Sequence, residues 1–428
     1  MVEREVIRRI IIEGQEFVNE ISLTERPFFF EQKGNYVFVG IRQAGKSYLL
    51  YQRIQQLLRE EHNINEIVYI NFDDERLRQM TADDLDLILQ AYHSLFDLRP
   101  LLFFDEIQNI EGWEHFARRL ANQKYNIYIT GSNAKMLSRE IATTLGGRFW
   151  NKDVYPYSFA EYLNARDIIL SKNWMYGKQA AEVSKAFNDY FLYGGFPELT
   201  DVIAKRVWLN DIYSKIFFSD LIVRNKVRNE EALGLLVRRL AENVKQPVSY
   251  TRLANLISSI GIKISKATVI EFIRYLKESC LIFPIENYAA KFAERNSNMK
   301  HYFIDNGLLS IFLLDGNTSL LENIVAIHLY KRYGAQLYFY NQNIEVDFII
   351  PEAKTAIQVS YSLMDETTCR REVEGLIKLN RVFPMDNMCI ITRDEERIIT
   401  HESGVSIHVI PVWKWLEDGK ILDPSECA

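Results

Sequence analysis

One octapeptide limits the folds open to this chain more than any other feature. The segment Gly40-Ile-Arg-Gln-Ala-Gly-Lys-Ser47 fits the pattern G-x-x-x-x-G-K-[ST] and stands between a short apolar run at Tyr36–Val39 and a helical stretch at Ser47–Glu60. Glycine lacks a Cβ and reaches positive φ, so backbone N–H groups can close round a phosphate. The pattern predicts an α/β fold in which a strand, a phosphate-binding loop and a helix follow one another in a parallel-sheet P-loop core.

The positions of this segment have predicted roles in holding a nucleotide. Lys46 is expected to bring positive charge to the β- and γ-phosphates, and Ser47 to offer its hydroxyl to Mg²⁺ at a helix start that attracts anions. A chance match in a glycine-containing turn is the alternative, and the strand and helix patterns on either side argue against it. The predicted cofactors are therefore ATP and Mg²⁺. The predicted ATP-binding residues are Gly40, Ile41, Arg42, Gln43, Ala44, Gly45, Lys46, Ser47 and Tyr48.

Two carboxylates follow a second apolar run. The four residues of Leu101–Phe104 lead directly into Asp105 and Glu106, which places both acids at the carboxyl end of a buried strand. Ligands bind at that end of the strands in open parallel sheets. We expect Asp105 to bind Mg²⁺ together with Ser47, and Glu106 to orient and deprotonate the attacking water. A solvated loop acid is the alternative for Glu106.

Three further residues are weaker candidates. Ser132 or Asn133, at the polar end of the strand Ile127–Thr130, can sense the γ-phosphate or cap the helix that follows, and the sequence leaves both interpretations open. Arg148 is a candidate finger for the nucleotide of its own or a neighbouring subunit, with an ordinary surface arginine as the alternative. The candidate catalytic residues are Lys46, Glu106, Asn133 and Arg148.

Patterns of periodicity predict four regions. Strand and helix patterns alternate up to about Phe159, which indicates right-handed crossovers and a parallel sheet. A whole β–α unit at 67–96 lies between the two motifs, so another strand is expected to separate the loop strand from the Asp-Glu strand. The predicted regions are a P-loop ATPase core at 1–158, a helical lid or linker at 159–228, a winged-helix-like module at 229–305 and a mixed α/β domain at 306–428.

The third region contains three helical segments followed by two strand-like runs, an order typical of a winged helix. Its last helix carries basic residues on the side that would enter a major groove, diluted by Glu271 and Glu278. DNA binding and packing against a protein partner therefore stay equally open. The basic-side candidates are Lys266, Thr268, Arg274 and Lys277.

Net charge, cysteine spacing and the distribution of apolar residues limit the partners and the cellular compartment expected for this chain. The formal net charge of −6 gives no overall attraction to nucleic acid, so any DNA contact requires a local basic face. The four cysteines have no CxxC spacing, which favours reduced thiols over a zinc site. The N-terminal residues lack the apolar core of a signal peptide, and the apolar runs are too short to cross a bilayer. We therefore expect a cytoplasmic protein without membrane contact, and the sequence does not indicate its oligomeric state.

Taken together, these motifs resemble the AAA+-related P-loop ATPases of bacteria and archaea that carry a C-terminal domain of unknown function. The resemblance covers nearly the whole chain and implies an ATPase core, a small helical lid, a winged helix and a terminal restriction-endonuclease-like fold. It rests on the phosphate loop, Phe103-Phe-Asp-Glu-Ile-Gln-Asn109, Ile129-Thr-Gly-Ser-Asn-Ala134, Leu145-Gly-Gly-Arg148, Tyr155-Pro-Tyr-Ser-Phe-Ala-Glu-Tyr-Leu163, Tyr193-Gly-Gly-Phe-Pro-Glu198 and Ile344-Glu-Val-Asp-Phe348.

A nuclease of that fold needs an early helical acid, a strand Asp, and Glu-x-Lys on the next strand to bind Mg²⁺ and activate water. Glu322 and Asp347 fit the first two places. The third place reads Gln358-Val-Ser360 and lacks both the carboxylate and the lysine. We therefore expect a catalytically inactive domain that is used for binding.

These observations predict an ATP-hydrolysing conformational switch coupled to a macromolecular partner, with DNA as the first hypothesis and a protein as the second. The competing hypothesis is a nucleotide-dependent protein-interaction scaffold with little hydrolysis.

Overall fold

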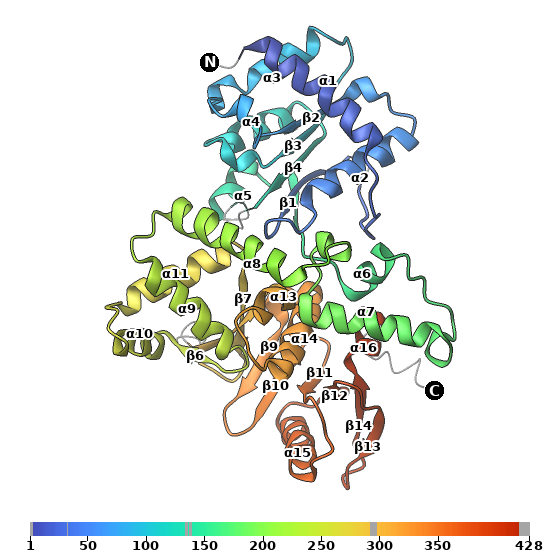
Figure 1. The fold of residues 1–428 in the computed structure, drawn as a ribbon, viewed down its shortest axis with the longest axis vertical. Helices are drawn as coiled ribbons and strands as arrows, with labels where there is room; N and C mark the ends of the chain where they lie inside the picture. Colours follow the sequence, from blue (N-terminus) through green and yellow to red (C-terminus); the bar gives the residue numbers. More distant parts are fainter. Residues whose placement is uncertain (1–2, 32, 133–135, 137–138, 292–297, 419–428) are drawn as a thin grey trace. The chain divides into compact units, whose positions relative to one another are not determined.

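The computed structural model divides the chain into two compact units, which are described separately (Figure 1). It describes residues 3–31, 33–132, 136, 139–291 and 298–418. The first unit is Met1–Tyr155 with Glu278–Cys280, and the second is Pro156–Lys277 with Leu281–Ala428.

The first unit is built on a five-stranded sheet in the order β2-β3-β4-β1-β5, with every neighbouring pair parallel. This confirms the predicted α/β P-loop core. Strand β4 lies between the loop strand β1 and the Asp-Glu strand β3, so the predicted separation of the two motifs is also confirmed. The strands are β1 Asn35–Val39, β2 Ile67–Asn71, β3 Leu101–Asp105, β4 Ile127–Gly131 and β5 Phe149–Asp153.

Helices cover both faces of this sheet, with α4 and α5 on one side and α2 on the other (Figure 1). Helix α4 shows why: Trp113, Phe116, Ala117, Leu120 and Ala121 are its buried residues and recur at the spacing of a single helical face. The α-helices are α1 Arg4–Glu20, α2 Lys46–Arg59, α3 Asp86–His93, α4 Trp113–Asn122 and α5 Arg139–Leu145, and the 3₁₀ turns are η1 Ile64–Glu66, η2 Glu75–Leu77, η3 Ala82–Asp84 and η4 Ile107–Asn109.

The second unit begins with helices, as the sequence predicted for its first part. Helix α8 continues into a π-helix, η8, and α6 begins at a Ser158 cap whose side chain accepts from the N–H of Glu161. These elements are α6 Phe159–Ala165, η6 Trp174–Tyr176, α7 Gln179–Tyr193, η7 Pro197–Thr200, α8 Lys205–Lys215 and η8 Ile216–Val223.

Three helices and an antiparallel ribbon follow in the expected order. Strands β7 and β8 form the ribbon, and β6 adds to the edge of β8. The assignment of this module as a winged helix stays a prediction. Its elements are α9 Glu230–Glu242, β6 Val248–Ser249, α10 Tyr250–Ser259, α11 Lys266–Glu278, β7 Ile282–Asn287 and β8 Asn298–Phe303.

The ribbon belongs to a larger mixed sheet with the order β13-β14-β12-β11-β10-β9-β7-β8-β6. Strand β7 pairs in parallel with β9, so one sheet runs across the predicted boundary at 305/306. The predicted mixed α/β character of the C-terminal region is confirmed. Its elements are α13 Asn306–Ser310, α14 Asn317–Tyr333, η9 Gly334–Gln336, β9 Tyr338–Asn341, β10 Glu345–Ile350, β11 Thr355–Val359, α15 Glu366–Val382, β12 Asn387–Thr392, β13 Arg397–Thr400, β14 Ser406–Pro411 and α16 Val412–Asp418.

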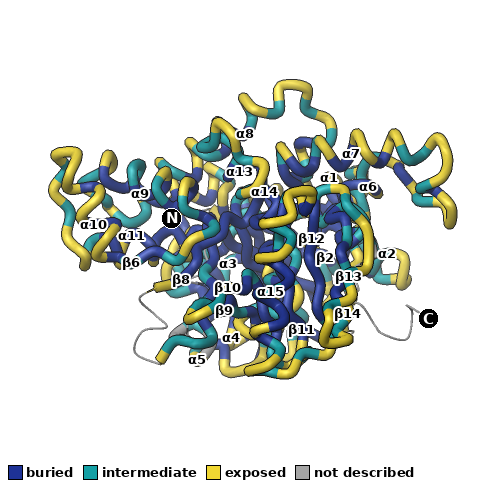
Figure 2. Tube along the Cα trace, turned by 90° about the horizontal axis from the view of Figure 1, so that it is seen from below, coloured by how far each residue is buried: buried dark blue, intermediate teal, exposed yellow. Residues whose placement is uncertain are grey.

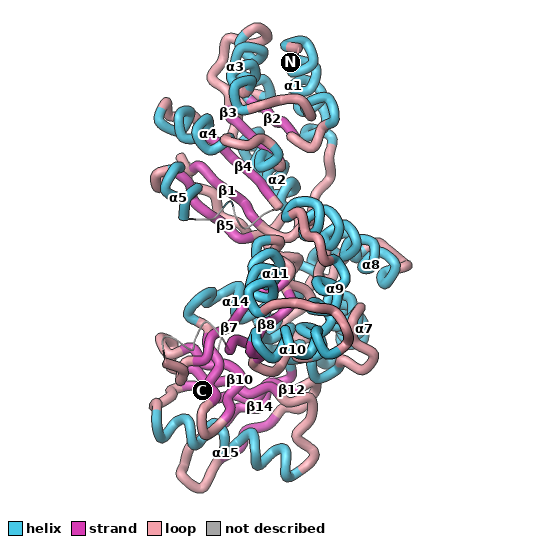
Figure 3. The backbone as a smooth tube through the Cα atoms, turned by 90° about the vertical axis from the view of Figure 1, so that its left-hand side faces the viewer, coloured by secondary structure: helices cyan, strands magenta, loops and turns pink. Residues whose placement is uncertain are grey.

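Buried residues concentrate in the strands, and exposed residues lie mainly on helices and loops (Figure 2). Each unit thus carries its sheet as a core with helices packed on it (Figure 3). Within the described ranges, no helix has the length and apolar character needed to cross a lipid bilayer.

Candidate functional site

The phosphate loop is held in the shape that its glycines allow. Gly45, at the start of α2, has φ 90°, and Gln43 also lies at positive φ. Gly40 is required for a second reason, because a Cβ at this position would lie 1.9 Å from the carbonyl oxygen of Val154. The loop therefore needs glycine both to turn around a phosphate and to pass the backbone that follows β5.

Lys46 is buried at the base of the loop and is only 4 % exposed. Its ammonium donates a 3.1 Å hydrogen bond to the carbonyl of Ile41 and lies 3.7 Å from Oε1 of Glu106. The structure therefore brings the loop lysine and the acid of the neighbouring motif together, as the sequence predicted. One positive charge lies within reach of both the loop and the acid.

Asp105 is almost fully buried and is surrounded by hydroxyl groups. Its carboxylate accepts hydrogen bonds from Tyr69, at 2.8 Å, and from Thr130, and it also interacts with the Ser47 hydroxyl. Burial raises the pKa of Asp105, while the three hydroxyls lower it. Because carboxylate and hydroxyl oxygens are the ligands that Mg²⁺ prefers, Asp105 and Ser47 together fit the predicted cation.

Glu106 has an unusual backbone conformation and an ionised side chain. Its φ of 52° is left-handed, which is uncommon for a residue with a Cβ. Burial alone would raise the pKa of Glu106, but the Lys46 ammonium and the amide of Gln108 hold it below its usual value. A carboxylate that stays ionised at neutral pH can accept a proton from water.

Thr130 links the two acids and was missed from the sequence. Its hydroxyl donates to Asp105 and accepts the backbone N–H of Glu106 at 3.0 Å. Gln108 and Tyr69, which each bond one of the acids, were also missed. A signal existed for Thr130, since it is a polar residue next to the last position of an apolar strand, β4, which pairs with β3.

The two sensor candidates have different outcomes. Ser132 is buried, accepts a 3.4 Å hydrogen bond from Gln108, and helps to lower the pKa of Glu106. Asn133 lies outside the described residues, so its predicted catalytic role stays a prediction.

Arg148 lies away from the site of its own chain. It immediately precedes β5, where Phe149 pairs with Asn35, whereas the loop follows the other end of β1. At about 3.3 Å per residue, a five-residue strand separates the two ends by about 16 Å. The structure therefore contradicts a contact between Arg148 and the nucleotide of the same chain. A contact with a neighbouring subunit's nucleotide stays a prediction.

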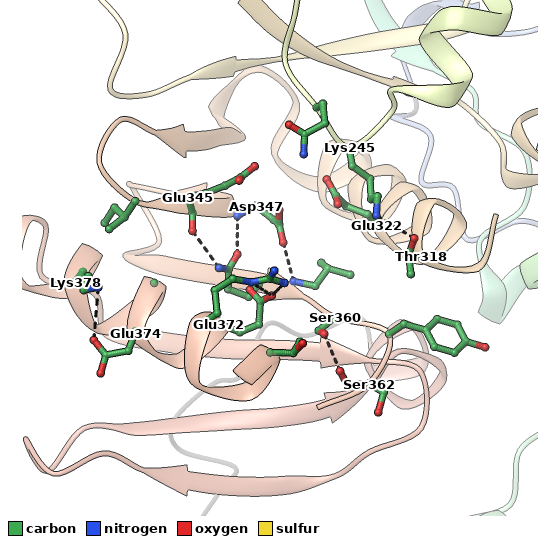
Figure 4. Close-up of a pocket in the computed structure, with 18 of the residues that line it drawn as sticks. Lys245, Thr318, Glu322, Glu345, Asp347, Ser360, Ser362, Glu372, Glu374 and Lys378 are labelled. Carbon is green, nitrogen blue, oxygen red and sulfur yellow. Dashed lines mark hydrogen bonds and ion pairs between the residues drawn. The ribbon is translucent and has the colours of Figure 1, made fainter. Parts of the chain in front are cut away.

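A second cluster of acids lies in a pocket of about 700 Å³ in the second unit (Figure 4). Asp347 on β10 and Glu322 on α14 both line this pocket, as the sequence suggested for a nuclease-like site. Gln358 does not face them as a ligand, because its amide donates to the carbonyl of Glu345 and accepts from the N–H of Asp347.

Comparisons with known proteins match two parts of the chain to family models and most of the chain to two relatives. A family model described as an AAA domain matches residues 32–163, and a model of a domain of unknown function, DUF8612, matches 184–319. The MJ1544 protein of Methanocaldococcus jannaschii is 32% identical over 97% of this chain and 96% of its own length. A protein of Haemophilus influenzae is 30% identical over 80% of this chain and 86% of its own. Among solved structures, the Walker-type ATPase PABY2304 of Pyrococcus abyssi is 14% identical with a TM-score of 0.42, covering 73% of this chain and 96% of that one.

Proposed function

We propose that this chain, which belongs to the same family as the M. jannaschii and H. influenzae proteins, is a switch that hydrolyses ATP to change how it binds a macromolecule. It is a nucleotide-binding ATPase of the AAA+-related P-loop kind. The proposal adds the residues that perform hydrolysis, the need for Mg²⁺, and the partner.

One observation carries the hydrolytic part of the proposal. The Lys46 ammonium lies 3.7 Å from Glu106 Oε1, and the Ser47 hydroxyl reaches Asp105, so loop and acids form a single site. The loop backbone and Lys46 would bind the phosphates, while Ser47 and Asp105 would hold the metal ion. Bound Mg²⁺ would neutralise charge that builds up on the phosphate oxygens.

We assign to Glu106 the role of the general base that activates the attacking water. Its carboxylate would orient a water molecule and accept its proton, while the water oxygen bonds to the γ-phosphorus and the bond to the β-phosphate oxygen breaks, so that ADP leaves. The αL backbone and the Thr130 hydrogen bond fix the direction in which this side chain leaves the strand. The Gln108 amide binds the second carboxylate oxygen and leaves fewer orientations open to it.

The test compares phosphate release by the wild type and by Glu106→Gln, which keeps the size of the side chain and removes its basicity. We expect the turnover number to fall by about 10²–10⁴-fold with little change in ATP affinity. Glu111→Gln, a change of the same kind in the same unit, serves as the matched control and should leave turnover unchanged. Equal, near-zero rates in the wild type and Glu106→Gln would support the nucleotide-dependent scaffold instead.

DNA is the partner that we propose, through helix α11. Lys266, Arg274 and Lys277 are exposed on this helix, while Phe272 and Leu276 are buried on its other side. Arg274 lies 3.9 Å from Glu271, so part of the positive charge is already balanced. The remaining charge supports a modest, salt-sensitive contact with phosphates.

A further inference from the structure

A fully buried lysine lies among the acids of the pocket in the second unit. Lys300, on β8, is 0 % exposed. Its ammonium donates to Glu322 Oε1 at 3.1 Å and to Asp347 Oδ1 at 3.2 Å, and it lies 3.9 Å from Glu345 Oε1. The three carboxylates belong to α14 and β10, which are 22 to 47 residues away in the sequence. The Lys300 ammonium thus links its own strand, β8, to helix α14 and strand β10.

The surroundings of Lys300 fix it in this position. Tyr302, two residues along the same strand, donates a 2.7 Å hydrogen bond to Glu322, and Phe339 places its ring 5.6 Å from the ammonium. Asp347 is held on its other oxygen by the N–H of Val359 at 2.9 Å. A lysine amine has three N–H donors, and the carboxylates offer acceptors for them. The ammonium is therefore held in a fixed position against three acids that line the pocket.

Charge balance agrees with this geometry. Burial alone would lower the pKa of Lys300, but Glu322, Asp347 and Glu345 outweigh burial and raise it, so the amine stays charged. A buried charge of this kind requires paired and hydrogen-bonded partners. Glu322 and Asp347 supply these partners to the ammonium of Lys300.

We infer that Lys300 is a built-in cation that takes the place of a divalent metal ion between Glu322 and Asp347. Mg²⁺ needs oxygen ligands at about 2.0–2.1 Å, and an ammonium at hydrogen-bond distance from both acids excludes it. The pocket is thus an acid site closed to divalent cations by one side chain.

The test removes the charge and asks whether a metal ion replaces it. Lys300→Met keeps most of the length and the apolar character of the stem, and it leaves the acids without their cation. We expect Mn²⁺, added to nucleotide-free full-length protein, to raise the unfolding temperature of Lys300→Met by several degrees, because the ion binds the folded state alone. In the wild type, Mn²⁺ should change the unfolding temperature no more than it does in Asp347→Asn, because the ion does not bind at Asp347. Isothermal titration calorimetry with Mn²⁺ should show the same difference.

Two controls make the result specific. Lys245→Met removes a lysine that lines the same pocket but bonds Thr318 at 2.9 Å, and it should behave as the wild type does. The double variant Lys300→Met/Asp347→Asn should lose the Mn²⁺ response. Mn²⁺ binding by the wild type that depends on Asp347 would overturn the inference, and so would a Lys300→Met protein without any Mn²⁺ response.

Should Lys300→Met fail to fold without metal, refolding decides the matter. Recovery of native circular dichroism in Mn²⁺ but not in EDTA supports the inference, and no recovery in either contradicts it. Because no nucleotide is present, the outcome is independent of ATP hydrolysis in the first unit.

Discussion

The hydroxyl of Thr130 accepts the backbone N–H of Glu106 at 3.0 Å. The same hydroxyl donates to Asp105, so one side chain on β4 fixes both acids at the end of β3. Threonine has one donor hydrogen and two acceptor lone pairs, and both kinds of bond are used here. The spacing between Asp105 and Glu106, the proposed metal ligand and the proposed base, is thus set by the neighbouring strand.

Thr130→Val should slow hydrolysis by about 10–100-fold, the usual effect of losing a group that orients a metal ligand. Valine keeps the shape of the side chain, so the unfolding temperature should change little compared with the turnover number. Thr130→Ser keeps the hydroxyl and should retain most of the activity. Steady-state phosphate release at saturating ATP measures the effect, and equal rates for Thr130→Val and Thr130→Ser would show that the hydroxyl has no role.

Arg148 should act on the nucleotide of a neighbouring subunit. Arg148→Ala should then lower turnover by about 10³–10⁵-fold, as expected for a finger. A mixture of Arg148→Ala and Glu106→Gln subunits should recover activity, because one supplies the base and the other the arginine. Lys124→Ala is the matched control, since Lys124 lines the same surface pocket. No recovery on mixing would rule out a contact between subunits.

DNA binding through α11 should depend on salt and on three side chains. Replacing Lys266, Arg274 and Lys277 by alanine should reduce the slope of log affinity against log salt by about 3. Fluorescence anisotropy with a labelled duplex measures this slope.

The control for that experiment removes equal charge elsewhere in the second unit. Lys172, Lys178 and Lys185 are exposed and lie outside α11. If this second triple variant weakens binding as much as the first, α11 is not the DNA-binding surface, and packing against a protein remains as its role.

The stability of the chain should fall as pH rises through weakly acidic values. Burial, followed by the charge of Asp347, raises the pKa of Glu322 from 4.5 to about 7, although Lys300 opposes the shift. The folded chain therefore binds more protons than the unfolded chain between these values, and its free energy of unfolding decreases with pH there. The contribution is fully present below pH 4.5 and is lost by about pH 7. A shift of this size corresponds to about 3 kcal/mol.

Glu322→Gln should weaken this pH dependence, because the amide cannot titrate, while Asp305, whose pKa burial raises to about 6, still contributes to it. Urea unfolding at pH 5 and at pH 7.5 checks the prediction in both proteins. Glu366→Gln, an exposed acid on α15, should leave the pH dependence unchanged. The same slope in the wild type and Glu322→Gln would show that another group titrates.

Features formed by residues that are close together in the sequence could be predicted from it. The phosphate loop and the Asp105-Glu106 pair are short motifs with apolar strands before them, and both were placed correctly. Strand β5 was missed because Phe149–Asp153 is a largely exposed edge strand without an apolar run. Without β5, the sequence could not indicate that Arg148 lies at the end of the sheet opposite the phosphate loop.

The missed site residues depend on contacts between distant parts of the chain. Thr130 reaches Asp105 across 25 positions, and Lys300 reaches Asp347 across 47. Lysine side chains are rarely buried, so the residues next to Lys300 in the sequence do not indicate that it is buried. Only the order of the strands in the sheet brings these groups together.

The parallel pairing of β7 with β9 has a consequence for the ribbon that β7 forms with β8. Because Glu286 and Asn287 are hydrogen-bonded neighbours of Tyr338 and Phe339, the ribbon cannot swing as a free wing. A chain cut after residue 305 would leave the backbone of β7 open along one side, and an open strand edge recruits other chains. By pairing with β7, strand β9 of the C-terminal region covers this edge and so protects it from aggregation.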